Sequence, residues 1–185
     1  MEADTVMRTL TSVELTPSEV AAIRKLLVEA FGVDDEERFE DSDWEHALGG
    51  THFVLEDAGE VVAHAAVVER ELHVGGRRLR TGYVEAVATA PAHQGKGFGT
   101  LVMRDVGAYI ASGFELGALG TGVFRFYERL GWLRWRGPSS VRMPDGSIRT
   151  TTDDDGYIMV LPTPSSPTLD LTGPIICEWR PGDVW

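Results

Sequence analysis

The chain has 185 residues, 43% hydrophobic and 25% charged, a composition typical of a folded globular protein rather than a disordered one. Its 29 acidic residues outnumber 17 basic ones, and the net charge of −12 argues against nucleic acid or an anionic membrane surface as a partner; it favours a cationic partner, or serves solubility alone. No apolar run approaches membrane-spanning length, the N-terminus lacks a signal-peptide profile, and the single cysteine, Cys177, suits a reducing cytoplasm.

Apolar periodicity and turn signals predict alternating strands and helices along the chain. Thr16-Pro17-Ser18-Glu19 has the spacing of a capping box with proline at the first helical position, so a helix begins there. The predicted strands cover residues 6–15, 52–56, 61–74, 77–89, 116–120 and 157–161, and the predicted helices cover residues 17–32, 44–48, 98–113 and part of 121–129. We find no internal repeat and no linker, and we expect one domain over residues 1–185.

Two stretches are strongly acidic. Residues 33–43 contain seven carboxylates in eleven positions, which repel one another and predict an exposed loop. Ser42 or Asp43 can cap the short helix that follows. A second acidic loop covers residues 151–156. Each loop is either a solvated connector or a rim that attracts a polycation.

A glycine-rich run links one predicted strand to the next helix. Pro91 ends the strand, since proline has no N–H for a ladder, and Gly95, Gly97 and Gly99 follow just before the helix. Unpaired amides at a helix start bind phosphate well, and glycines let an anion approach the backbone. The spacing matches neither a dinucleotide-binding fingerprint nor a P-loop. The alternative is a glycine-rich connection without a ligand.

Two motifs resemble the GCN5-related N-acetyltransferases (GNAT superfamily). Gln94-x-x-Gly97-x-Gly99 resembles the signature that holds the pyrophosphate of acetyl-coenzyme A, and Tyr127-x-x-x-Gly131-Trp132 resembles a later segment of that fold. The resemblance implies an α+β fold with a central, mostly antiparallel mixed β-sheet flanked by helices. It also implies acetyl-coenzyme A as the cofactor and no metal.

Further segments resemble one branch of that superfamily, the aminoglycoside 2′-N-acetyltransferases. They are residues 43–46, 63–68, 82–85, 131–133, 153–156 and 179–185. This resemblance implies acetyl transfer to the 2′-amino group of aminoglycoside antibiotics by direct attack, with antibiotic resistance as the result. It also implies a homodimer. Two tryptophans and a Pro-Gly pair in the last seven residues predict that the tail, residues 162–185, packs on the domain. The loop before Asp43 differs in length from the family pattern, and residues 120–122 form a shorter, more glycine-rich segment.

The resemblance also assigns roles to residues. Glu85 is implied as the base that takes a proton from the amine, through bridging water, and Tyr127 as the acid that protonates the leaving thiolate. The alternatives are that Glu85 pairs with Arg80 or another cation and that Tyr127 is a core tyrosine. Cys177 is not expected to be acylated, because nothing in its sequence neighbourhood would lower its pKa.

The remaining site residues bind the two substrates. Implied for acetyl-coenzyme A are the strand end, the loop and the helix start: Val87, Ala88, Thr89, Gln94, Gly95, Lys96, Gly97, Phe98, Gly99 and Thr100, with Tyr127. Implied for the aminoglycoside are mainly carboxylates: Asp34 or Asp35, Asp43, Glu85, Ala86, Gly120, Asp153, Asp154, Asp183 and Trp185, the last through a terminal carboxylate.

Two other functions remain open at this point. The first is acetylation of another cationic amine, such as a polyamine, a cell-wall amino sugar or a peptide, because acidity alone does not distinguish these from an aminoglycoside. The second is a module that binds coenzyme A or a drug without catalysis, against which the presence of Glu85 and Tyr127 argues.

Overall fold

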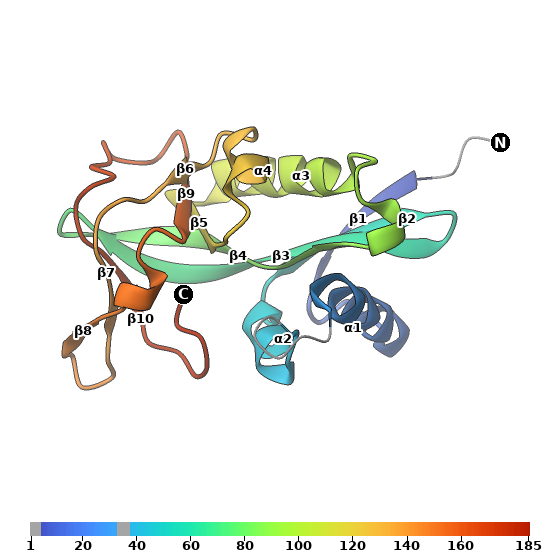
Figure 1. The fold of residues 1–185 in the computed structure, drawn as a ribbon, viewed down its shortest axis with the longest axis horizontal. Helices are drawn as coiled ribbons and strands as arrows, with labels where there is room; N and C mark the ends of the chain where they lie inside the picture. Colours follow the sequence, from blue (N-terminus) through green and yellow to red (C-terminus); the bar gives the residue numbers. More distant parts are fainter. Residues whose placement is uncertain (1–4, 33–37) are drawn as a thin grey trace. The chain divides into compact units, whose positions relative to one another are not determined.

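The structure is a computed structural model that describes residues 5–32 and 38–185 (Figure 1). The predicted site positions Asp34 and Asp35 lie outside the described residues. Contacts divide the chain into two compact units. Unit 1 takes in Met1–Val68 and Val84–Val106, and unit 2 takes in Glu69–Tyr83 and Gly107–Trp185.

Unit 1 is a set of antiparallel strands with helices. Strand β2 pairs antiparallel with β1, Thr5 opposite Asp57, and with β3, Thr51 opposite Val67. Its elements are β1 (Thr5–Thr11), α1 (Pro17–Phe31), α2 (Asp41–Ala47), β2 (Thr51–Asp57), the first part of β3 (Glu60–Val74), the end of β4 (Arg77–Thr89), η1 (Pro91–His93) and the start of α3 (Phe98–Gly113). The cofactor motif therefore lies wholly in this unit.

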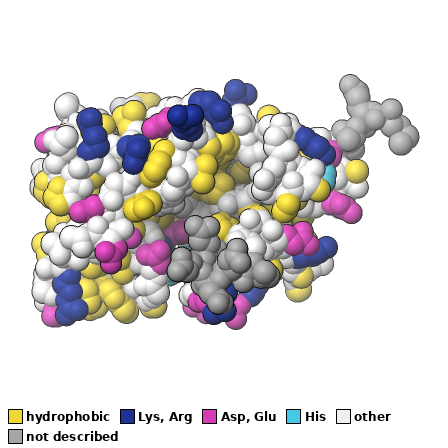
Figure 2. Space-filling model, viewed as in Figure 1, with side chains coloured by type: hydrophobic (Ala, Val, Ile, Leu, Met, Phe, Trp, Pro, Cys, Tyr) yellow, Lys and Arg dark blue, Asp and Glu magenta, His cyan; other side chains and the backbone are white. Residues whose placement is uncertain are grey.

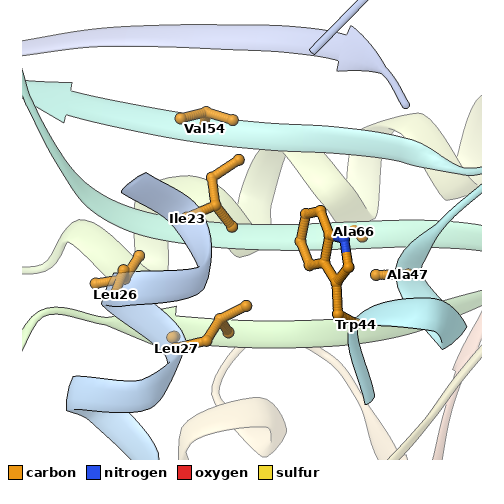
Figure 3. Close-up of a cluster of buried hydrophobic side chains, with 8 residues drawn as sticks. Ile23, Leu26, Leu27, Trp44, Ala47, Val54 and Ala66 are labelled. Atoms are coloured by element: carbon orange, nitrogen blue, oxygen red, sulfur yellow. The ribbon is translucent and has the colours of Figure 1, made fainter. Parts of the chain in front are cut away.

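The core of unit 1 forms where α1 and α2 pack on the strands (Figure 3). Helix α1 buries one face, because Ile23, Leu26 and Leu27 recur at helical spacing. Trp44 of α2, 5% exposed, lies in the same cluster. The strands contribute Val54, Ala66 and Ala88. Ala88 connects this core to the end of β4, which bears the predicted catalytic carboxylate.

Unit 2 contains most of the remaining strands. Its elements are β5 (Leu116–Gly120), α4 (Phe124–Glu128), β6 (Leu133–Arg134), β7 (Ser139–Arg142), β8 (Ile148–Thr150), η2 (Thr152–Asp154), β9 (Ile158–Pro162) and β10 (Ile175–Glu178), with the remaining parts of β3, β4 and α3. The strand order is β6-β9-β5-β4-β3-β10-β7-β8. The pairs β4–β5 and β10–β7 are parallel, whereas β5–β9, β6–β9, β7–β8 and β3–β10 are antiparallel. The predicted α+β class with a mixed, mostly antiparallel sheet is confirmed.

Close packing in unit 2 explains one of its glycines. A Cβ at Gly117 of β5 would lie 2.9 Å from the Cβ of Leu161 and 3.1 Å from Cγ2 of Ile110. Distances that short are not tolerated between carbon atoms, so only glycine lets α3 and β9 approach β5 this closely.

Some predicted elements need correction. Helix α2 begins one residue after Glu40, which is its N-cap, and Asp43 occupies the third helical position instead of the cap. Strand β1 ends at Thr11 rather than at residue 15. Strands β6, β7, β8 and β10 were not predicted. The four residues of β10 gain their hydrogen bonds from distant partners, Leu72–Val74 of β3 and Ser139–Arg142 of β7. No helix among the described residues is long and apolar enough to span a membrane.

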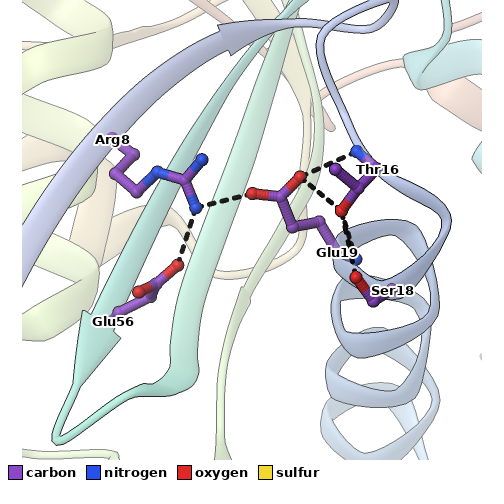
Figure 4. Close-up of polar contacts among 5 residues, drawn as sticks. All are labelled: Arg8, Thr16, Ser18, Glu19 and Glu56. Atoms are coloured by element: carbon purple, nitrogen blue, oxygen red, sulfur yellow. Dashed lines mark hydrogen bonds and ion pairs between the residues drawn. The ribbon is translucent and has the colours of Figure 1, made fainter.

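The capping box of α1 includes a carboxylate, Glu19, whose contacts are drawn in Figure 4. Because this group titrates, the stability of the folded chain depends on pH. Glu19 accepts hydrogen bonds from the Thr16 N–H and hydroxyl, 2.7 Å each, and pairs with Arg8. These contacts, chiefly the backbone bond from Thr16, lower the pKa of Glu19 from 4.5 to about 2. A carboxyl with a lowered pKa stabilises the folded state above pH 4.5 and loses this effect as the pH falls toward 2.

We therefore expect Glu19→Gln to lower the free energy of unfolding at neutral pH by about 1 kcal/mol, the usual contribution of a cap. The difference from the parent protein should shrink as the pH falls from 4.5 toward 2. Urea unfolding followed by tryptophan fluorescence measures both. Glu29→Gln, which removes only an exposed pair with Lys25, is the control. A difference that does not change with pH would contradict the assignment.

Candidate active site

The glycine-rich loop of unit 1 ends at the open start of α3. Gly95 and Gly97 have φ of +78° and +87°, and a Cβ on either would meet no atom within 4 Å. The Leu101 N–H bonds the Gly97 carbonyl at 3.1 Å, so the amides of residues 98–100 precede the first helical hydrogen bond. No acidic side chain occupies this first turn. Exposed glycine backbone and a helix N-terminus together form a cradle suited to a phosphate or diphosphate.

The end of β4 leads directly into that cradle. Glu85, Ala86 and Val87 are partly exposed, and Ala86 has φ of +52°, in the left-handed region. Gln94 donates from its side-chain amide to the Thr89 carbonyl at 3.3 Å, which ties the loop to the strand end. The two groups of predicted cofactor residues in unit 1, 87–89 and 94–100, are therefore joined by a hydrogen bond. Glu85 lies just before the first group in the chain.

Two residues considered above, Arg80 and Asp43, have other contacts in the structure. Arg80, the partner considered above for Glu85, bonds the Glu69 carboxylate at 2.7 Å and the Gly113 carbonyl. Asp43 accepts the Glu40 N–H at 2.8 Å, so one of its oxygens caps α2. Asp43 can still offer a second oxygen to a cation.

Tyr127 of unit 2 lies in α4 and is 7% exposed. Its ring packs edge-on against Phe126 and Trp132, with centroids 4.9 and 6.0 Å away. Burial raises the pKa of the Tyr127 hydroxyl to about 12. The phenol therefore keeps its proton at neutral pH, and the raised pKa makes it a weaker proton donor than an exposed tyrosine.

Carboxylates gather around η2 in unit 2. Burial, then the charges of Asp183, Asp153 and Asp155 in that order, raises the pKa of Asp154. Asp155 is engaged internally, since its Oδ1 accepts the Ser139 N–H at 2.7 Å and the Ser139 hydroxyl at 2.8 Å. Figure 2 shows acidic side chains on the face around the C-terminal end. Asp153, Asp154 and Asp183 thus form an acidic cluster that favours a bound cation.

Trp185 packs into the same part of unit 2. It is 6% exposed, and its indole N–H donates to the Thr151 hydroxyl at 2.9 Å. Its backbone N–H donates to Asp183 at 3.2 Å. A Cβ built on Gly120 would lie 3.9 Å from the Trp185 carbonyl carbon and 3.7 Å from the Tyr83 hydroxyl. The structure therefore brings Asp153, Asp154, Asp183, Trp185 and Gly120 into one region.

Sequence reasoning missed two polar residues of this region, Thr151 and Tyr83. Thr151 is the first residue of the second acidic loop, and Tyr83 follows Gly82 within the predicted strand. These signals are weak, because the partners that bring both residues to Trp185 are distant in sequence. Among residues 5–32 and 38–185, no three His, Cys, Asp or Glu side chains are arranged to hold a metal ion.

The sequence matches known proteins over most of its length. A family model described as "Acetyltransferase (GNAT) domain" matches residues 13–134. The chain belongs to the GNAT acetyltransferase family. The aminoglycoside 2′-N-acetyltransferase of Mycolicibacterium fortuitum is 45% identical to this acetyltransferase over 165 residues, 88% of this chain and 83% of that protein.

Solved structures of the same fold share less sequence with this acetyltransferase. The GNAT-family protein YhbS of Escherichia coli, in complex with CoA, superposes with a TM-score of 0.65 at 17% identity, over 96% of this chain and 91% of that one. A GNAT-family acetyltransferase of Brucella melitensis, in complex with acetyl-CoA, gives 0.58 at 22%, over 89% and 94%. The Kribbella flavida N-acetyltransferase gives 0.58 at 24%, over 72% of this chain but 34% of that one, so this chain spans about a third of its length. These likenesses confirm the fold.

The raised pKa of Asp154 in the acidic cluster leads to a prediction about the free energy of unfolding. A carboxyl whose pKa is raised in the folded state binds its proton more tightly there, so its ionisation destabilises the fold as the pH rises above 3.8. We expect Asp154→Asn to raise the free energy of unfolding at neutral pH by less than about 1 kcal/mol, the scale of a surface charge interaction. The gain should vanish at acidic pH.

The matched control is Asp145→Asn. Hydrogen bonds from the Ser147 hydroxyl and N–H lower the pKa of Asp145, so this variant should be destabilised at neutral pH, the opposite sign. Thermal and urea unfolding of both variants give the comparison. A loss of stability in Asp154→Asn would show that its charge is not repelled by the cluster.

Proposed function

We propose that this acetyltransferase transfers the acetyl group of acetyl-coenzyme A to the 2′-amino group of aminoglycoside antibiotics, which would confer resistance to them. The observation that carries the proposal is the 45% identity, over 88% of the chain, to a protein named for that activity. The acidic cluster supports it, because aminoglycosides carry several ammonium groups.

The loop and the helix start of unit 1 fit the diphosphate of coenzyme A. The positions of the missing Cβ atoms at Gly95 and Gly97 are open, and the amides that begin α3 have no carboxylate beside them in the first turn. Residues 87–89 of β4 would bond the pantetheine arm, and residues 94–100 would hold the diphosphate. When bound, the cofactor supplies the acetyl group as a thioester.

The chain's own residues would move the protons. An ammonium cannot attack a carbonyl until it loses a proton, and Glu85 is the proposed acceptor of that proton, directly or through water. Tyr127 is the proposed donor to the departing thiolate, since its hydroxyl is protonated at neutral pH. Cys177 is buried, and burial raises the pKa of its thiol to about 11. A low thiolate content makes an acyl-cysteine intermediate unfavourable and supports direct attack by the amine.

Carboxylates are the proposed contacts of the drug. Asp153, Asp154 and Asp183 would bind ammonium groups, with Trp185 and Gly120 beside them, and Asp43 and Glu85 would do so in unit 1. Each charge-assisted hydrogen bond typically contributes about 1.5–3 kcal/mol. A homodimer, implied by the family resemblance, and a cytoplasmic location, expected from the single cysteine, stay predictions that light scattering and cell fractionation can test.

A substrate panel tests the proposal. Purified protein with acetyl-coenzyme A should release coenzyme A thiol with tobramycin, which has a 2′-amino group, and not with an otherwise similar drug bearing a 2′-hydroxyl. Release with polyamines, amino sugars or peptides but not with tobramycin would assign another amine as the substrate. Binding of both ligands without thiol release would indicate a binding module.

Glu85→Gln is expected to lower kcat by about 100-fold or more, since removal of a general base typically costs that much. Coenzyme A affinity, measured by calorimetry, should not change. Glu60→Gln, at the exposed first residue of β3, is the control and should keep the parent kcat. A Glu85→Gln enzyme with full activity would exclude this residue as the base.

Gly97→Ala is expected to weaken coenzyme A binding at least about fivefold, because a left-handed backbone costs other residues about 1 kcal/mol or more and a methyl group would line the cradle. Calorimetry with coenzyme A measures the change. Gly113→Ala, at the other end of α3, has open space and no left-handed φ, so it should bind coenzyme A as the parent does. Equal affinities in the two variants would remove the loop from the cofactor site.

A further inference from the structure

A line of hydrogen bonds runs through the core of unit 1 and ends at the predicted catalytic strand. The Ser12 hydroxyl lies 2.8 Å from Nε2 of His52, Nδ1 of His52 lies 3.0 Å from Nε2 of His64, and Nδ1 of His64 lies 2.8 Å from the Ala86 carbonyl oxygen. Both imidazoles are 0% exposed. Trp44 covers them, with ring centroids 5.6 and 6.3 Å away.

The direction of this line follows from its last member. A carbonyl oxygen only accepts, so Nδ1 of His64 carries the proton and donates it to Ala86. Nε2 of His64 must then accept from Nδ1–H of His52, and Nε2 of His52 must accept from the Ser12 hydroxyl. Ser12 in turn accepts the Gly49 N–H at 2.9 Å. Each ring nitrogen in the line then has a single role, as donor or as acceptor, which fixes both rings in one tautomer. The Ser12 hydroxyl also lies 3.3 Å from the Gly50 carbonyl oxygen.

Both rings remain neutral at physiological pH. Burial lowers the pKa of His52 to about 4 and that of His64 to about 3. The rings therefore do not act as proton acceptors near pH 7, and a role in the chemistry must come from geometry.

The geometry at the end of the line is unusual. Among the described residues, Ala58 and Ala86 are the non-glycine residues with positive φ, both at 52°. Ala58 lies in the turn between β2 and β3, where such values are common, but Ala86 lies within β4. A strained residue inside a strand persists only where its surroundings hold it, and such residues occur mainly at functional sites.

We propose that His64 is a positioning residue of the transferase site, which holds the Ala86 carbonyl and so keeps the backbone left-handed between Glu85 and Val87. The inference rests on the proposed function, because Glu85 is the proposed base and residues 87–89 are the proposed contacts of the pantetheine arm. If the Ala86 carbonyl were released, the backbone could return to the extended region, and the Glu85 carboxylate would move relative to the following amides. His52 and Ser12 support this role, because the hydrogen bond from His52 to Nε2 of His64, itself fixed by Ser12, holds His64 in the required tautomer.

Paired variants at position 64 separate the hydrogen bond from the packing. The amide nitrogen of asparagine can occupy the place of Nδ1 and donate to Ala86, whereas that of glutamine reaches the place of Nε2. We expect His64→Gln to lower kcat by about 10- to 100-fold, as small displacements of reacting groups do. His64→Asn should keep kcat within about threefold of the parent for the same reason. KM for both substrates should change little in either. Equal losses of kcat in the two variants would overturn the proposal.

A second substitution tests whether His64 acts through Ala86. Glycine adopts the left-handed conformation without a steric penalty, so Ala86→Gly should reduce the dependence on His64. The loss of kcat caused by His64→Gln should be clearly smaller in the Ala86→Gly background than in the parent. The same loss in both backgrounds would show that the two residues act independently and would overturn the proposal.

Two controls complete the test. Ile23→Val, in the same core cluster, lowers stability without touching the line and should keep the parent kcat. If His64→Gln does not fold, nitrogen-15 spectra of the parent protein decide, because the proposal requires the Nδ1–H tautomer in both His52 and His64. An Nε2–H tautomer at His64 would overturn it. A parent enzyme without thiol release contradicts the proposed function, whereas an active parent with an equally active His64→Gln contradicts only the positioning role.

Discussion

The first amides of α3 have no helical hydrogen-bond partner, and they impose a constraint on the residues around them. They can face a diphosphate only if the preceding residues carry no obstructing side chain and no negative charge approaches. Gly95 and Gly97 satisfy the first condition with left-handed backbone and open space. The absence of acidic residues in the first turn of α3 satisfies the second, although the chain carries a net charge of −12. An acidic protein can therefore bind an anionic cofactor, because a helix N-terminus acts over a short range.

The acidic cluster of unit 2, the proposed binding surface for the drug, opposes stability. Asp154 lies near Asp153, Asp155 and Asp183, and both burial and repulsion raise its pKa. Selection for folding alone would disperse these charges, whereas a polycationic ligand would neutralise them. Asp155 differs from its neighbours, because two hydrogen bonds from Ser139 anchor it and make it part of the scaffold. Adjacent residues in one acidic loop thus have different tasks, which their contacts distinguish.

Sequence patterns were most informative where structure is local. The capping box of α1, the extents of β4 and α3 and the glycine-rich loop all follow from neighbouring residues, and all agree with the structure. Strand β10 could not be predicted, because its four residues gain their order from β3 and β7. The same holds for Thr151, which becomes part of the site only through the indole of Trp185. Asp155 has the same acidic signal as Asp153 and Asp154. The family resemblance left it out of the predicted site, and its contacts with Ser139 supply the physical reason.

The chemistry of the side chain, and not a sequence pattern, explains why histidine occupies position 64 in the buried pair. An apolar side chain at position 64 would pack in this core but leave the Ala86 carbonyl without its donor, and an unsatisfied buried polar group costs about 1–3 kcal/mol. Lysine or arginine could donate, but burying an isolated charge costs far more. A neutral imidazole supplies a rigid donor, and its low pKa keeps it neutral over the range in which an amine can lose its proton. The second nitrogen of His64 then needs a hydrogen-bond donor, which His52 supplies, and His52 in turn accepts from Ser12.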